Sequence, residues 1–258
     1  HAVLEWSHRT TGVAVGLLMI ASAGRIVLRH RSNRPLVVAG VVSLALLVIV
    51  GVIGGRVVLS GLDPGLRTAH LGLAEIDLLA AIVALTLAAW PAQVIGRPRG
   101  SDSPARAAGK LAAVAAGAAL IALLSGSYAV WREAGAGCAS WPLCGGDVIP
   151  NSGLVWIHVA HRLFALAAVI LAVWAALRAL RLPVPPAAVR AAALGVLTIA
   201  IAQLLVGAAN PWTDFSRGAR AVHLLVATLM WANAALMAML IWLPLWKAGW
   251  NGGAETVE

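Results

Sequence analysis

The sequence predicts an all-α integral membrane protein, a tandem repeat of four-helix bundles about a parallel pseudo-two-fold axis, with seven transmembrane helices in this chain. Of its 258 residues, 61% are hydrophobic and 11% are charged, whereas a soluble domain carries about 25% charged residues. Seven apolar runs reach the roughly 20 residues that a helix needs to cross a bilayer. An offset of 153 residues maps histidines and arginines of the first half onto those of the second.

The apolar runs and the basic loops between them predict the helices and their orientation. Arginine-rich loops follow the first, third and fifth runs, and the positive-inside rule places them in the cytoplasm. The loops at 60–69, 131–154 and 209–219 are then external, in a multi-pass protein of the cell membrane (plasma or inner membrane). The basic loops also explain the net charge of +9, so we expect no nucleic-acid partner. The helices are expected near 6–28, 36–59, 70–94, 110–130, 155–179, 186–208 and 220–246.

The repeated residues are two pairs of histidines and the arginines beside them. Within each pair the histidines are 62 residues apart, and the offset relates His8 to His161, His70 to His223, Arg9 to Arg162 and Arg67 to Arg220. The fifth to seventh helices map onto the first to third, and the fourth maps to positions before residue 1. We therefore expect a further helix upstream and two four-helix units, represented here by 1–96 with three helices and 97–258 with four.

The two histidines of each half are expected at the outer ends of helices that face each other across a bundle. Two imidazoles that converge in an apolar site are typical of the axial ligands of a haem iron. Zinc is less favoured, because no thiolate or carboxylate cluster accompanies them. The alternative is that they are hydrogen-bonded packing residues, which the cost of burying ionisable groups in a membrane disfavours.

The repeated arginines are candidates for contacts with haem propionates. Arg67 and Arg220 each precede a histidine by three residues and share its helical face. Arg9 and Arg162 follow their histidines directly and point about 100° away. We expect these two to serve a different edge of the haem or a loop.

Acidic residues distinguish the first half from the second. Glu5 lies three residues before His8 on the same face, and its counterpart in the second half is His158. Glu75 and Asp77 have uncharged counterparts. Acidic groups inside a membrane are rare and usually functional, so we expect proton-coupled chemistry in the first half and a bound cofactor or electron transfer in the second. The alternatives are solvation by headgroups for Glu5, and an ion pair with an arginine for the other two.

Cys138 and Cys144 are the only cysteines, and both lie in the long external loop. An exported loop permits disulfides, and the short spacing predicts a bridge between them. Such a bridge is either a structural crosslink or a redox-active pair near the second site.

Three segments resemble the haem A synthase family. Glu5-Trp6-Ser7-His8-Arg9 resembles its Glu-x-x-His-Arg motif, and the run from Cys138 to Cys144, which ends in Trp-Pro-Leu-Cys, resembles its cysteine loop. His158-Val159-Ala160-His161-Arg162, together with His70 and His223, is similar to the remaining ligand histidines of the family. The match runs through the whole chain in order and spacing, and it implies two similar four-helix bundles.

The resemblance also implies an activity: oxidation of a methyl group of haem O to a formyl group, by successive hydroxylation with oxygen from water. The product is haem A for respiratory oxidases. His8 and His70 would hold the substrate haem O, His161 and His223 a haem b cofactor, and Glu5 would be the catalytic carboxylate. The implied partners are haem O, haem O synthase, cytochrome oxidase assembly factors and membrane lipid, and a homo-oligomer is left open.

The main competing function is a bis-histidine dihaem cytochrome that transfers electrons without substrate chemistry. Glu5 and the cysteine loop favour an enzyme, because electron transfer needs neither. A protein that binds and delivers haem, or a transporter, is less favoured. The tryptophans are scattered at helix boundaries, and the sequence lacks paired helices broken by glycine or proline at the membrane midplane.

Overall fold

The computed structural model describes residues 2–89, 104–138, 140–142, 144 and 152–252. These residues form α-helices and a short 3-10 helix, η2 (Ala134–Gly137), and they contain no strand. Seven of the helices are long and apolar enough to cross a membrane, which confirms the expected all-α membrane fold. They are α1 (Ala2–Arg29), α2 (Arg34–Leu59), α3 (Pro64–Ala89), α4 (Pro104–Trp131), α5 (Gly153–Leu180), α6 (Ala187–Trp212) and α7 (Arg217–Gly252).

The helix ends differ from the predicted ends where local capping extends a helix beyond its apolar run. α3 begins at Pro64, six residues before the expected start, because the Asp63 carboxylate accepts a hydrogen bond from the Leu66 backbone N–H (2.8 Å). In the second half of the chain, α6 continues to Trp212, four residues beyond the expected end at 208. The expected loops 60–69 and 209–219 are therefore mostly helical. Residues 90–94 of the expected third helix, and the expected domain boundary after residue 96, lie outside the described residues.

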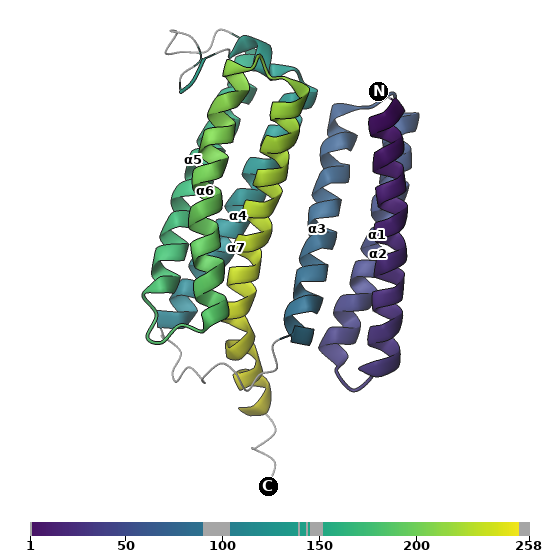
Figure 1. The fold of residues 1–258 in the computed structure, drawn as a ribbon, viewed down its shortest axis with the longest axis vertical. Coiled ribbons are helices and arrows are strands. Elements are labelled where there is room, and N and C mark those ends of the chain that lie inside the picture. Colours follow the sequence, from purple (N-terminus) through teal and green to yellow (C-terminus); the bar gives the residue numbers. More distant parts are fainter. Residues whose placement is uncertain (1, 90–103, 139, 143, 145–151, 253–258) are drawn as a thin grey trace.

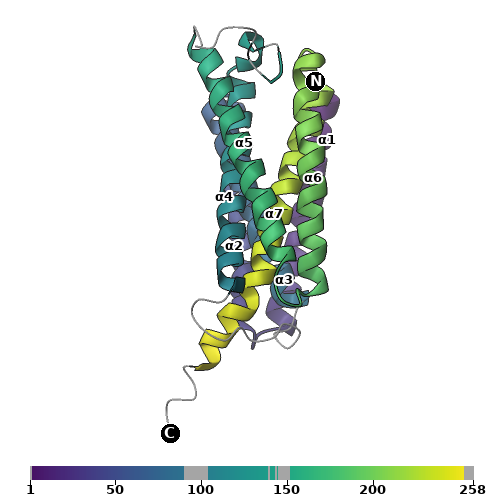
Figure 2. The same cartoon turned by 90° about the vertical axis from the view of Figure 1, so that its left-hand side faces the viewer.

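The helices form two groups that stand side by side (Figure 1). α1, α2 and α3 make one group, α4 to α7 make the other, and α3 packs against both α4 and α7 where the groups meet. The start of α1 and the Cys138–Cys144 loop lie at the same end of the molecule in both views (Figures 1 and 2). We call this end the disulfide end.

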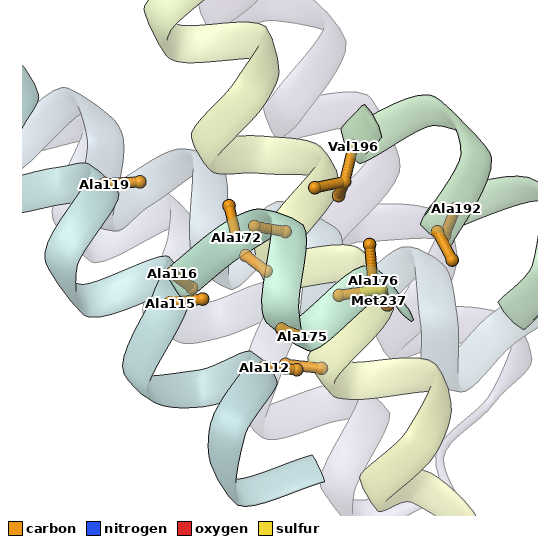
Figure 3. Close-up of a cluster of buried hydrophobic side chains, with 14 of the residues drawn as sticks. Ala112, Ala115, Ala116, Ala119, Ala172, Ala175, Ala176, Ala192, Val196 and Met237 are labelled. Atoms are coloured by element: carbon orange, nitrogen blue, oxygen red, sulfur yellow. The ribbon is translucent and has the colours of Figure 1, made fainter. Parts of the chain in front are cut away.

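Alanines make most of the core of the second group (Figure 3). Ala112 and Ala115 on α4, Ala172 and Ala175 on α5, and Ala193 on α6 are all fully buried. Small side chains let helix backbones approach closely, which favours dispersion contacts where lipid provides no hydrophobic drive for helix association. The second group is thus a tightly packed bundle.

The two halves meet at a pair of repeat-equivalent residues. The Thr228 hydroxyl on α7 donates a hydrogen bond to Glu75 Oε1 on α3 (2.7 Å), and these residues are separated by the repeat offset of 153. Equivalent residues touch only where the axis that relates them passes between them. This contact therefore locates the pseudo-two-fold axis between α3 and α7.

Candidate functional site

Each half brings its two histidines together with the same geometry. The ring centroids of His8 and His70 are 6.4 Å apart and the ring planes cross at 86°. The ring centroids of His161 and His223 are also 6.4 Å apart, and their planes cross at 85°. The sequence repeat is therefore also a repeat of two histidine sites, one between α1 and α3 and one between α5 and α7.

The spacing of each pair fits two imidazoles on one metal ion. Metal–nitrogen bonds of about 2 Å, with each nitrogen about 1 Å from its ring centre, put the ring centres about 6 Å apart. The described residues contain no group of three or more histidine, cysteine or acidic side chains arranged to hold a metal ion, so neither site offers the ligands of a closed zinc site. Two nitrogen donors fit the axial positions of a haem iron, whose porphyrin supplies the remaining ligands.

Backbone carbonyls orient two of the four imidazoles. The Nδ1–H of His70 donates to the Val50 carbonyl (3.1 Å), and that of His161 donates to the Ala122 carbonyl (3.1 Å), with the Ser125 hydroxyl 3.2 Å away. A ligand histidine in a metalloprotein ordinarily donates its second ring N–H to such an acceptor. Both rings therefore keep Nε2 free for a metal.

Glycines let three of the rings rest on the backbone of a neighbouring helix. A Cβ added at Gly126 would lie 2.7 Å from the His161 ring, and one added at Gly54 would lie 2.9 Å from the His70 ring. Gly207, the repeat equivalent of Gly54, would place its Cβ 3.3 Å from His223. Gly54 and Gly207 are related by the repeat offset of 153, but only the fold reveals Gly126 as a contact of the candidate ligand His161.

Glu5 is positioned by its own helix. The Arg9 guanidinium donates to Glu5 Oε1 over 2.6 Å, and both side chains are about 60% exposed. Glu5 lies on α1 one turn before His8, at the disulfide end. The carboxylate is thus beside the first histidine site and paired with the arginine of the same motif.

Arg67 and Arg220, the arginines that precede His70 and His223, lie in the first turns of α3 and α7. Arg67 on α3 stacks on Trp131, with its guanidinium carbon 4.2 Å from the centre of the ring. Arg220 on α7 lies three residues before His223, and its backbone N–H donates to the Ser216 carbonyl (3.0 Å). Arg67 therefore contacts α4, across the boundary between the two groups of helices.

Arg162 holds the cysteine loop, which is the second of the two roles expected for it. Its guanidinium donates to the carbonyls of Pro142 (2.7 Å), Ser140 (2.7 Å) and Cys138 (3.5 Å). Cys138 and Cys144 form the expected disulfide. Because Arg162 follows His161 directly, one turn of α5 carries both a candidate ligand and the support of the disulfide loop.

We expect Arg162→Lys to loosen this loop. A lysine lacks the planar fork that reaches two carbonyls, and each lost hydrogen bond to a charged group costs about 1.5 kcal/mol or more, which corresponds to roughly tenfold more of the open loop. The measurement is the rate of limited proteolysis within 138–152, with Arg178→Lys at the far end of α5 as the control. Equal rates in both variants would contradict this role.

His158, the repeat equivalent of Glu5, supports the short helix η2 that leads into the cysteine loop. It is buried, its Nδ1–H donates to the Ala134 carbonyl in η2 (3.3 Å), and its ring lies edge-on against Phe215 at 5.6 Å. The position that carries Glu5 in the first half therefore carries a packing residue in the second.

Glu75 and Asp77 are buried, and each accepts a hydrogen bond from a hydroxyl group. The described residues show no ion pair between either of them and an arginine, which was the alternative expectation. Glu75 accepts from Thr228, as described above, and Asp77 accepts from the Ser43 hydroxyl on α2 (2.7 Å). The repeat equivalents of Ser43 and Asp77 are the buried apolar residues Val196 and Met230. The interior of the first group is thus more polar than that of the second at the same depth.

Comparison with known proteins agrees with this arrangement. Residues 1–235 match the family described as cytochrome oxidase assembly protein. A protein named Heme A synthase from Alkalihalophilus pseudofirmus is 27% identical over 251 residues, which cover 94% of this chain and 81% of that protein. Another of the same name from a Methylobacterium species is 33% identical over 258 residues, which cover 92% of this chain and 66% of that protein.

A third relative has a different name. A segment of a protein named Protoheme IX farnesyltransferase, from Chloroflexus aurantiacus, is 32% identical over 147 residues. The segment covers 54% of this chain and 24% of that protein. The family match, in contrast, extends over nearly all of the seven helices and both histidine sites. This chain belongs to the cytochrome oxidase assembly protein family.

Proposed function

We propose that this protein is a haem A synthase, an oxidoreductase that converts a methyl group of haem O into a formyl group. The observation that carries the proposal is the asymmetry of two otherwise equal sites. Both histidine pairs have the same spacing, but only the first has a carboxylate one turn from a ligand. The names of the relatives support the same activity.

The reaction assigned to the first site needs a base. Oxidising the methyl group with one water gives an alcohol and releases two protons and two electrons. A second oxidation with another water gives a geminal diol and releases two more protons and two more electrons, and loss of one water leaves the formyl group. The four electrons must pass to an oxidant that is not part of this chain. Glu5 is the acceptor for protons released at the edge of the substrate, and its negative charge stabilises any cationic species that forms there.

His8 and His70 would hold the substrate haem O from α1 and α3. The Val50 carbonyl fixes the orientation of the His70 ring, and Gly54 leaves room for that ring against α2. Arg9 keeps the Glu5 carboxylate at one end of α1. These contacts restrict the orientation of the His70 ring and of the Glu5 carboxylate, and such positioning favours efficient proton transfer.

His161 and His223 would hold a haem b cofactor from α5 and α7. When bound, this haem would supply one-electron redox chemistry. The chain's own contribution is an alanine-lined bundle, together with the disulfide loop held by Arg162 and the short helix η2 held by His158. These parts would fix the helices that carry His161 and His223.

The location and the partners follow from the same proposal. The arginine-rich loops at the opposite end support a location of the disulfide end outside the cell membrane, by the positive-inside rule. A partner that attaches a farnesyl group to protohaem would supply the substrate, and the similarity to part of a protein named Protoheme IX farnesyltransferase supports such a link. Haem A would then pass to a terminal oxidase.

The test is conversion in cells. The full-length protein is expressed with a source of haem O in a strain that makes no haem A, and extracted haems are separated. Haem A, together with its hydroxylated precursor, is the expected product. Haem O that persists unchanged in the presence of well-folded, haem-loaded protein would reject the proposal.

We also expect Gly126→Ala to weaken haem binding at the second site. The added methyl group meets the His161 ring at 2.7 Å, so the ring must shift, and disturbing the surroundings of a ligand typically costs 10- to 100-fold in affinity. Gly117→Ala in the same helix is the control, because its methyl group meets no atom within 4 Å. Haem content per protein after purification is measured, and equal content in both variants would contradict the expectation.

A further inference from the structure

Three histidine rings rest against a glycine of a neighbouring helix, and His223 differs from the other two in the hydrogen bonding of its Nδ1 atom. His70 and His161 each donate Nδ1–H to a backbone carbonyl. In each case this carbonyl belongs to the residue four positions before the glycine on which the ring rests: Val50 before Gly54, and Ala122 before Gly126. His223 Nδ1 is buried and has no hydrogen-bond partner in the described part of the chain.

Gln203 occupies the position on α6 that corresponds to Val50 on α2. It lies four residues before Gly207 on α6 and is the repeat equivalent of Val50. Its Oε1 is also buried without a partner among the described residues. A donor and an acceptor that are both buried in a membrane bundle without a hydrogen bond raise the free energy of the fold. This cost disappears if they bond to each other or to a bound molecule.

The His223 ring also stands further from its glycine. A Cβ at Gly207 would lie 3.3 Å from Cε1 and 3.8 Å from Nδ1 of His223, whereas one at Gly54 would lie 2.9 Å and 3.3 Å from the same atoms of His70. The ring is therefore set back from the backbone carbonyl that serves its counterpart. A longer side chain that carries its own carbonyl can span this gap, and glutamine provides one.

We infer that Gln203 is a positioning residue for the second site, whose side-chain carbonyl accepts a hydrogen bond from the Nδ1–H of His223 when the haem is bound. This inference rests on the proposed haem site and adds a residue that neither the repeat nor the motifs assign. The first site uses a main-chain acceptor at the equivalent place, which mutation cannot remove. The second site uses a side chain, so evolution can adjust the electron-donating strength of this ligand alone.

Three variants test the inference in the purified, haem-loaded protein. Gln203→Leu keeps the bulk of the side chain but removes the acceptor, and Gln203→Glu supplies a stronger acceptor. Leu204→Ala is the matched control, because Leu204 is adjacent on α6 and 46% of its surface is exposed. The readouts are the reduction potential of the second-site haem and its dissociation into a haem-binding acceptor protein.

An acceptor on Nδ1–H makes the imidazole a better donor and stabilises ferric iron. We expect Gln203→Leu to raise the reduction potential, Gln203→Glu to lower it, and Leu204→Ala to leave it unchanged. Haem affinity should fall about 10- to 100-fold in Gln203→Leu. Shifts of the same sign in the leucine and glutamate variants, or no shift in either, would overturn the inference. If His223→Ala leaves the haem spectrum unchanged, the proposed second site itself fails, which is a distinguishable result.

Discussion

Replacing Glu5 with glutamine is expected to abolish formyl formation while both haem sites stay loaded. The amide keeps the size and shape of the side chain and one acceptor oxygen, but it cannot take up a proton and carries no negative charge. We expect the rate of haem A formation to fall at least about a hundredfold, which is about 2.7 kcal/mol of barrier. The measurement is the ratio of haem O, hydroxylated haem and haem A in cells that express the full-length variant.

Arg9→Gln is the matched control for this experiment. It breaks the same ion pair but retains the carboxylate group of Glu5. We therefore expect a much smaller loss of haem A formation than in Glu5→Gln. If the two variants lose activity equally, the ion pair matters and the base does not. If Glu5→Gln forms haem A at the wild-type rate, Glu5 is not the catalytic carboxylate, and Asp77, two turns along α3 from His70, becomes the next candidate.

Removal of either ligand of the second site is expected to eliminate the low-spin spectrum of its haem. If His161 and His223 hold a haem as proposed, His161→Ala and His223→Ala would each remove one of its protein ligands, and the loss of a ligand changes both the absorption and the reduction potential. We expect haem occupancy of this site to fall at least about tenfold, which is about 1.4 kcal/mol of binding free energy. Difference spectra of the purified variants measure it.

His30→Ala is the control for these two variants. His30 follows the last residue of α1 and has no equivalent in the repeat, so the haem spectrum should be unchanged. A spectrum that survives in both His161→Ala and His223→Ala would contradict the assignment of this pair.

The arrangement of the helices and the two histidine sites was predictable because both leave periodic signals. Apolar runs of membrane-spanning length give the seven helices, and the constant offset between His8 and His161, and between His70 and His223, predicts two equivalent sites. The equal centroid spacing of the two pairs follows from that repeat. The helix ends were less predictable, since caps such as Asp63 lie outside the apolar runs.

The contacts between elements were not predictable, because they depend on which faces the fold brings together. The sequence gives no sign that Thr228 meets Glu75 across the axis. It offers two roles for Arg162, and its contacts with the carbonyls of the cysteine loop are visible only in the fold. Gly126 has no visible repeat partner in this chain, so its contact with His161 appears only in three dimensions.

The identity of the haems extracted from the purified full-length protein tests the central claim most directly. A haem A synthase should yield haem b from the site of His161 and His223, together with haem O, its hydroxylated form or haem A from the site of His8 and His70. His8→Ala should lose haem O, its hydroxylated form and haem A, and it should retain haem b. Haem b alone, at two per chain in the wild type, would contradict the account and favour a dihaem electron-transfer cytochrome.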